Sequence, residues 1–313
     1  MDKRIVVPLD TSDLAEKVLP YIQLIANGLK AEVHLVTVAE PGAEKLEHPL
    51  RSYLTEAAGK LRLDKAAVRQ EVLFGRAADQ IVDYSVDNEA VMIAMASRGL
   101  SGVTRWVMGS VADKILRGAE CPVFLVKAPE PKKENPWRGK RIMICLDGSQ
   151  VAECVFRVMD EVSWAPEMDI DLVRVVEPPA VPQGVDQASP QWKGYADYIL
   201  SRSELAAKAY IEEIEKPLKK QGRWKTRTQV LFGEPARQII EYAGGNDVDV
   251  ILMSTIGRSG LGPWTHGGVA SKVVEGASTP ILLVNARRYM PKLEEDEDKG
   301  AGGSFPVWRI SGN

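Results

Sequence analysis

A loop rich in small residues lies in the first half of the chain, between an apolar run and a predicted helix. The apolar run covers residues 90–95, the loop begins with Ala96-Ser97-Arg98-Gly99, and helical spacing starts near Val111. Backbone N–H groups at a helix N-terminus are unpaired and lie at the positive end of the helix dipole, so they favour an anion. The stretch is therefore a candidate phosphate-binding loop.

Two common phosphate-binding motifs are excluded by the residues present. A P-loop requires Gly-Lys-Ser/Thr at the helix start, and no lysine follows Gly109. The dinucleotide-binding fingerprint requires clustered glycines directly after the first strand, and none directly follows Asp10. The loop has its own spacing: nine residues separate Gly99 from Gly109, Ser110 follows, and Ala96 stands three positions before Gly99.

An alternation of predicted strands and helices carries this loop. Helical spacing indicates a first helix that ends at Gly28, and residues 50–66 are also expected to be helical. Short apolar runs predict five strands, at residues 4–9, 31–38, 68–74, 90–95 and 122–126. Such alternation is typical of a parallel sheet covered by helices on both faces.

The same order of elements recurs in the second half. Residues 142–147 repeat residues 5–10 at an offset of 137, whereas residues 230–233 repeat residues 72–75 at an offset of 158. The chain is therefore a tandem duplication whose second half gains 21 residues. The gain falls in a Pro-rich stretch at residues 178–200, which we interpret as a surface insertion or as a flap beside the second site.

The repeat and the changes in composition divide the chain. We expect a first domain at residues 1–129, a linker at 130–138, a second domain at 139–288 and an acidic tail at 289–313. Within the tail, residues 292–299 hold five acids and two lysines, which account for the net charge of -3. We interpret this run as a solvated segment.

Bulk properties exclude several classes of partner and location. The charge balance gives no basic footprint for nucleic acid, and no apolar run reaches the ~18 residues of a membrane span. Without a signal peptide after Met1, we expect a cytoplasmic protein. Cys121, Cys145 and Cys154 lack metal-ligand spacing, and we expect Cys121 and Cys145 to be buried thiols.

The loop spacing resembles Gly-x2-Gly-x9-Gly-Ser/Thr, the nucleotide-phosphate loop of the universal stress protein family, with Ala96 in the first glycine position. In the second copy Ser254 replaces that glycine, and Gly267-Gly268 ends the loop without a hydroxyl. The resemblance covers both halves. It implies two doubly wound, three-layer α/β domains of strand order 3-2-1-4-5, paired through their fifth strands, and the binding of ATP or AMP.

In such a sheet the ligand lies beyond the carboxyl ends of strands one and four, where the strand order reverses. Asp10 ends strand one and the loop leaves strand four, so two distant segments are expected to meet there. Glycines allow close backbone approach, and arginine can neutralise phosphate. The site expected in the first half comprises Pro8, Leu9, Asp10, Val38, Ala96, Ser97, Arg98, Gly99, Gly102, Gly109, Ser110 and Val111. A weaker or empty second site comprises Asp147, Val175, Ser254, Gly257, Gly267 and Gly268.

Three functions remain open. The first is a stress-response regulator that binds ATP or AMP, with Mg²⁺ held by phosphate oxygens and water. The second is a nucleotide-free interaction scaffold, with an unknown protein partner or as a homodimer. The third is slow ATP hydrolysis, although an ATP pyrophosphatase needs Ser-Gly-Gly-x-Asp-Ser after the first strand and this chain has Asp10-Thr11-Ser12-Asp13. Since no catalytic set is evident, we expect a binding protein and not an enzyme.

Overall fold

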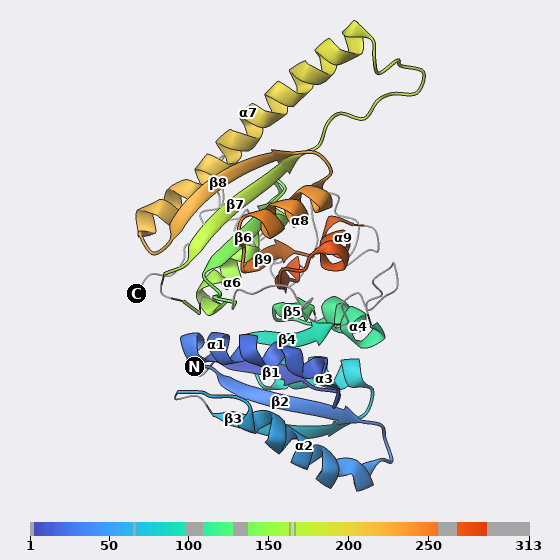
Figure 1. The fold of residues 1–313 in the computed structure, drawn as a ribbon, viewed down its shortest axis with the longest axis vertical. Coiled ribbons are helices and arrows are strands. Elements are labelled where there is room, and N and C mark those ends of the chain that lie inside the picture. Colours follow the sequence, from blue (N-terminus) through green and yellow to red (C-terminus); the bar gives the residue numbers. More distant parts are fainter. Residues whose placement is uncertain are drawn as a thin grey trace, which may run out of the picture.

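The computed structural model describes residues 3–64, 67–97, 109–127, 137–162, 164–165, 167–255 and 268–286 (Figure 1). In these residues ten strands form one sheet, in the order β3-β2-β1-β4-β5-β10-β9-β6-β7-β8. The first half contributes β1 (Arg4–Pro8), β2 (Glu32–Ala39), β3 (Val68–Phe74), β4 (Met92–Ser97) and β5 (Val123–Lys127). The second contributes β6 (Arg141–Leu146), β7 (Asp169–Val176), β8 (Lys225–Phe232), β9 (Val250–Ser254) and β10 (Ile281–Val284).

The strand order confirms the fold expected from the sequence. Each half has the order 3-2-1-4-5, and neighbouring strands within a half are parallel. The fifth strands pair antiparallel, with Leu125 opposite Ile281, Phe124 opposite Leu282 and Val123 opposite Leu283. Each half thus covers the β-edge that the other would leave open.

Helices cover both faces of the sheet. Because side chains alternate between the two faces along each strand, a hydrophobic core lies on each side. Ile5 and Val7 belong to one core, whereas Val6 belongs to the other, and both cores contain residues from the two halves. We call these the α1 face and the α4 face. The α1 face carries η1 (Ala15–Val18), α1 (Leu19–Leu29), α2 (Glu47–Gly59, preceded by η2, Glu44–Leu46), α5 (Gln150–Glu153), α6 (Val155–Val162) and α7 (Pro190–Gln221). The α4 face carries α3 (Ala77–Asp87), α4 (Ser110–Gly118), α8 (Pro235–Gly245) and α9 (Val269–Gly276).

An aromatic cluster joins the halves on the α1 face. The Trp137 ring lies 4.9 Å from that of Tyr21 and 6.1 Å from those of Phe124 and Trp164, measured between ring centroids. Each indole N–H donates a 2.8 Å hydrogen bond to a backbone carbonyl, so these rings are fixed without leaving a buried donor unpaired.

The first helix does not end at Gly28. Gly28 lies inside α1, and the helix ends after Leu29, where Lys30 takes the left-handed conformation with φ of 54°. A Cβ at position 28 would lie 1.7 Å from the backbone oxygen of Trp164, so glycine is required there for close packing and not for termination.

The helix predicted over residues 50–66 ends at Gly59. Side chains of α1 hold the following segment outside the helix, since Gln23 accepts from the Arg62 N–H (2.9 Å) and Asn27 accepts from the Asp64 N–H (3.0 Å). The prediction was therefore wrong for residues 60–64, because a tertiary contact overrides helical spacing there.

The Pro-rich insertion contains a long helix instead of only a loop. Ser189 caps α7 by accepting from the Trp192 N–H at 3.2 Å, Pro190 occupies the first turn, and Gly222 ends the helix with φ of 65°. The N-terminal half of α7 extends beyond the sheet (Figure 1). No helix in the described part of the chain is both long and apolar enough to cross a membrane.

The cysteine prediction is confirmed. Cys121 and Cys145, together with Cys154, are buried thiols that form no disulfide. Burial raises the pKa of Cys145 and of Cys154 to about 12, so both thiols stay protonated at neutral pH and are poor nucleophiles.

Candidate functional site

The strands β1 and β4 separate at the carboxyl edge of the first half. Two residue pairs join them, Ile5 with Met92 and Val6 with Ile93. Beyond these pairs β1 follows β2 and β4 follows β5, whose pairing continues to Ser97. The strand order reverses at this point, which is where open α/β sheets bind ligands.

Three predicted residues share the α4 face at this edge. Val38 packs against the α4-face core, and by strand alternation Pro8 and Ser97 fall on the same side as Val6 and Ile93. Ser97 is only 5% exposed, and its hydroxyl has no hydrogen-bond partner among the described residues. Leaving such a group unpaired costs about 1–3 kcal/mol, which a bound ligand or water would offset.

Leu9 and Ala96 lie on the opposite face. The Leu9 side chain is 2% exposed within the α1-face core, and its N–H donates to the Val36 carbonyl at 2.8 Å. Ala96 is partly buried against the same core. The Ala96 methyl group, which replaces the first glycine of the family motif, therefore does not narrow the α4 side of the edge.

Asp10 shapes the turn that follows β1. Its Oδ1 accepts from the Ser12 N–H at 3.1 Å and from the Ser12 hydroxyl at 2.5 Å, while Thr11 adopts φ of 65°. The exposed Asp10 carboxylate has a second oxygen that takes part in no hydrogen bond with the described residues. Asp147 builds the same turn in the second half, accepting from the Ser149 N–H and hydroxyl at 2.9 and 2.6 Å.

A glycine begins the helix that faces this edge. Gly109 is the N-cap of α4 and makes no side-chain cap, so the first-turn N–H groups, including those of Ser110 and Val111, have no partner within the helix. Its φ of -61° suits any residue, and no described atom lies within 4 Å of a Cβ placed there. The backbone conformation therefore does not require a glycine at this position. Gly268 caps α9 in the same way.

Five predicted residues lie outside the part of the chain that the structure describes. These are Arg98, Gly99, Gly102, Gly257 and Gly267. Their roles stay predictions.

The second half arranges its edge differently. Val175 packs on the α4 face, as Val38 does, but Ser254 is buried on the α1 side and hydrogen-bonds the Cys154 thiol. Cys145, buried in the α4-face core, stands where the first half has Pro8. Ser254 therefore does not line the α4 side of the edge.

A polar cluster that the sequence analysis did not predict lies beside this second edge. The Arg174 guanidinium lies 5.0 Å above the Tyr210 ring and packs against Gly148, where a Cβ would lie 2.9 Å from it. Tyr210 donates a 2.8 Å hydrogen bond to Glu153, and burial raises the pKa of that carboxyl. The sequence did contain one sign of this cluster. At the offset of 137, the position of Thr37 in the first half is occupied by Arg174 in the second half.

The first half also has a cluster of a tyrosine, a carboxylate and a basic side chain, but here the basic side chain is a lysine paired with the carboxylate. Glu16 forms a 2.7 Å ion pair with Lys60. The nearby Tyr53 hydroxyl is buried and lies close to the Glu16 carboxylate, although its geometry does not meet the limits of an ordinary hydrogen bond. Burial, with the charges of Glu16 and Asp10, raises the Tyr53 pKa, so the phenol stays neutral.

Fold and site together define a duplicated, doubly wound α/β protein with its candidate ligand edge between strands one and four. The family model described as the universal stress protein family matches residues 1–127 and 139–285. The chain belongs to the universal stress protein family, as its loop spacing indicated.

Similar proteins agree with this assignment. A universal stress protein of Methanocaldococcus jannaschii is 32% identical over 148 residues, which is 42% of this chain and 85% of that protein. One of Mycobacterium tuberculosis is 26% identical over 234 residues, which is 73% of this chain and 72% of that protein. The crystal structure of a universal stress protein from Archaeoglobus fulgidus matches with a TM-score of 0.64 at 18% identity, covering 90% of this chain and 98% of that one, and supports the fold alone.

Proposed function

We propose that the first half binds an adenine nucleotide, ATP or AMP, and that the protein acts through this binding as a regulator in the stress response. The observation that carries the proposal is the buried, unpartnered Ser97 hydroxyl at the point where β1 and β4 separate. It lies on the face covered by α4, whose glycine-capped N-terminus offers unpaired N–H groups.

Each part of the nucleotide has a complementary group. Pro8 and Val38 provide apolar surface for the base, and the second oxygen of Asp10 accepts from the ribose or the adenine. The first turn of α4 takes phosphate, where Gly109 allows the backbone to approach it. A magnesium ion, when present, is held by phosphate oxygens and water.

The proposed role is binding and not turnover. The second half is expected to bind nucleotide weakly or not at all, since Ser254 is committed to Cys154 and Arg174 packs over the Gly148 turn. The nucleotide bound in the first half is proposed to act as a signal or as a structural ligand, and a protein partner is proposed to recognise the bound form.

Titration of the full chain with a fluorescent ATP analogue tests the proposal. Gly109→Leu is expected to weaken saturable binding by at least about tenfold, because the side chain occupies the phosphate position while its backbone conformation suits leucine. The matched control is Gly268→Leu at the N-cap of α9, which changes the second half only. It should leave that affinity unchanged.

The alternative is a nucleotide-free scaffold of the same fold. Absence of saturable binding by the unmodified chain would support that alternative and sink the proposal. Equal loss in Gly109→Leu and Gly268→Leu, with circular dichroism unchanged, would mean that the ligand does not use the first half alone.

A further inference from the structure

The strand β8 forms one border of the sheet, and its outer edge is unpaired among the described residues. At its two ends Lys225 donates to the Met168 carbonyl (3.3 Å) and Gly233 donates to the Val176 carbonyl (3.1 Å), so odd-numbered residues face β7. The N–H and C=O groups of the even-numbered residues therefore point outward. These residues are Thr226, Thr228, Val230 and Phe232.

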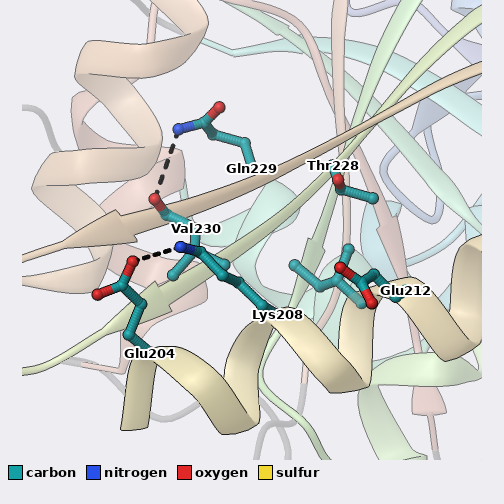
Figure 2. Close-up of a pocket in the computed structure, with 7 residues that line it drawn as sticks. Glu204, Lys208, Glu212, Thr228, Gln229 and Val230 are labelled. Carbon is teal, nitrogen blue, oxygen red and sulfur yellow. Dashed lines mark hydrogen bonds and ion pairs between the residues drawn. The ribbon is translucent and has the colours of Figure 1, made fainter. Parts of the chain in front are cut away.

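A groove of about 410 Å³ runs beside this edge, between β8 and α7. Its apolar part is formed by Ile211 and Val230, and Figure 2 shows polar residues of both elements around it. Of the charged residues that line it, Glu204 and Lys208 form a 2.6 Å ion pair, whereas the Glu212 carboxylate joins no close ion pair with the described residues and interacts over a longer distance with Lys216 on the same helix.

Two features show that the described residues leave this edge uncovered. Phe232, at the carboxyl end of β8, is 43% exposed. Among the described residues, the outward carbonyl of Val230 accepts a single long bond of 3.4 Å, from the neighbouring Gln229 side chain (Figure 2). A groove along an unpaired strand, with an apolar floor and polar sides, is a geometry to which an extended peptide adds as a further strand.

The C-terminal sequence contains a segment that fits this edge. After the glycine-rich segment Gly300-Ala301-Gly302-Gly303-Ser304 comes the largely apolar stretch Phe305-Pro306-Val307-Trp308-Arg309-Ile310. Arg309 carries the one charged side chain of residues 300–313. It is complementary to Glu212 in the groove.

The segment can reach β8 within the same chain. All five strands of the second half are parallel, so the chain leaves β10 at the carboxyl edge, where Phe232 also lies. Four strand spacings separate β10 from β8, about 19 Å. The 18 residues 287–304 span up to about 60 Å when extended.

We propose that residues 305–310 add to β8 of their own chain as an antiparallel strand, with Phe305 opposite Phe232, Val307 opposite Val230 and Arg309 opposite Thr228. In this register the inward-facing residues of the segment pair with the outward-facing residues of β8. Pro306 then points away from β8, so its missing N–H costs no hydrogen bond.

The side chains select this direction. Opposed residues of an antiparallel pair project to the same face, so Phe305 meets Phe232 and Val307 covers Val230 in the groove. Arg309 then lies beside Thr228, close to Glu212 on α7. A parallel strand that keeps the Pro306 nitrogen away from β8 would instead direct Pro306, Trp308 and Ile310 toward the groove and place Arg309 on the face opposite to Glu212.

Docking has a consequence for the second half. The connection from Ala286 to Phe305 crosses the carboxyl edge that carries Asp147 and Val175, and it contains the acidic residues 294–298. Negative charge there opposes a phosphate ligand. Nucleotide binding in the first half does not enter this inference, so either proposal can fail without the other.

Amide hydrogen exchange measured by NMR tests the added strand. In the full chain the outward N–H groups of Thr228, Val230 and Phe232 are expected to exchange at least about tenfold more slowly than in a variant ending at Gly303. The inward N–H groups of Gln229 and Leu231 are the internal control, because they bond to β7 in both proteins. Equal exchange of the outward set in both proteins overturns the proposal.

Engineered cysteine pairs test the register of the added strand and show whether it comes from the same chain or from a second copy. Val230→Cys with Val307→Cys places two Cα atoms about 5.5 Å apart on one face and should form a disulfide within the monomer. Gln229→Cys with Val307→Cys points the two thiols to opposite faces and should not. A covalent dimer from the first pair would assign the edge to the tail of a second copy and overturn docking within the chain, as would the absence of any disulfide.

Discussion

Gly28 of the first half lies against the backbone of Trp164 in the second half. We therefore predict that a methyl group added at position 28 forces the two halves apart at this contact. Gly28 lies in α1 of the first half, and an added Cβ would lie 1.7 Å from the Trp164 carbonyl oxygen, whereas real Cβ contacts stay beyond about 3.0 Å. The helix and the Trp164 segment must therefore move apart by about 1.3 Å. A backbone carbonyl cannot rotate away as a side chain can.

The expected magnitude follows from two opposing terms. Overpacking of a close contact costs about 1–3 kcal/mol, and a rigid backbone partner favours the upper end. Replacing glycine by alanine inside a helix returns about 1 kcal/mol. Gly28→Ala should thus lower the free energy of unfolding by about 2 kcal/mol.

Urea denaturation followed by circular dichroism measures this change. The matched control is Gly59→Ala at the end of α2, where no described atom lies within 4 Å of the new Cβ. That variant should be as stable as the unmodified chain or more stable by up to about 1 kcal/mol. If Gly28→Ala behaves like Gly59→Ala, the close approach of the halves at this point is refuted.

Further predictions concern buried polar groups. Lys127 donates to the Glu275 carbonyl at 2.6 Å, and burial lowers its pKa to about 8, so the unfolded chain binds the proton more tightly. Unfolding free energy should therefore rise between pH 8 and about pH 10.4, and Lys127→Met should remove that rise in urea titrations. Tyr210→Phe deprives buried Glu153 of its donor and should cost about 1.5–3 kcal/mol. Tyr53→Phe removes a hydroxyl that lies near Glu16 without a well-formed hydrogen bond and should cost less than Tyr210→Phe, so equal losses in the two phenylalanine variants would contradict this reasoning.

The repeat made most of the fold predictable. Residues 230–233 match residues 72–75, and each precedes a helix that the structure contains. Prediction failed where a distant contact controls a local choice. Gly28 serves as a packing glycine because Trp164 approaches it, and residues 60–64 leave the helix because side chains of α1 bind their backbone.

The sequence predicted the candidate site as a set of residues, but it did not predict the face of the sheet on which each residue lies. Asp10 and Ser97 were expected at one edge, and in the structure β1 and β4 pair only as far as Val6 and Ile93 before they separate towards that edge. It also assigns Leu9 and Ala96 to the opposite face, where they belong to or pack against the α1-face core. The Arg174 cluster had a signal in the sequence, a threonine replaced by arginine, but no indication of what it would contact.

The amino-acid sequence by itself determined the duplicated α/β architecture, because alternating apolar runs and their recurrence are local properties that each segment carries in its own residues. Only the tertiary structure decided which face each site residue occupies, which glycines serve packing, and that β8 is left with an open edge beside α7. Those outcomes depend on strand register and on partners more than a hundred residues away, and spacing along the chain does not encode them.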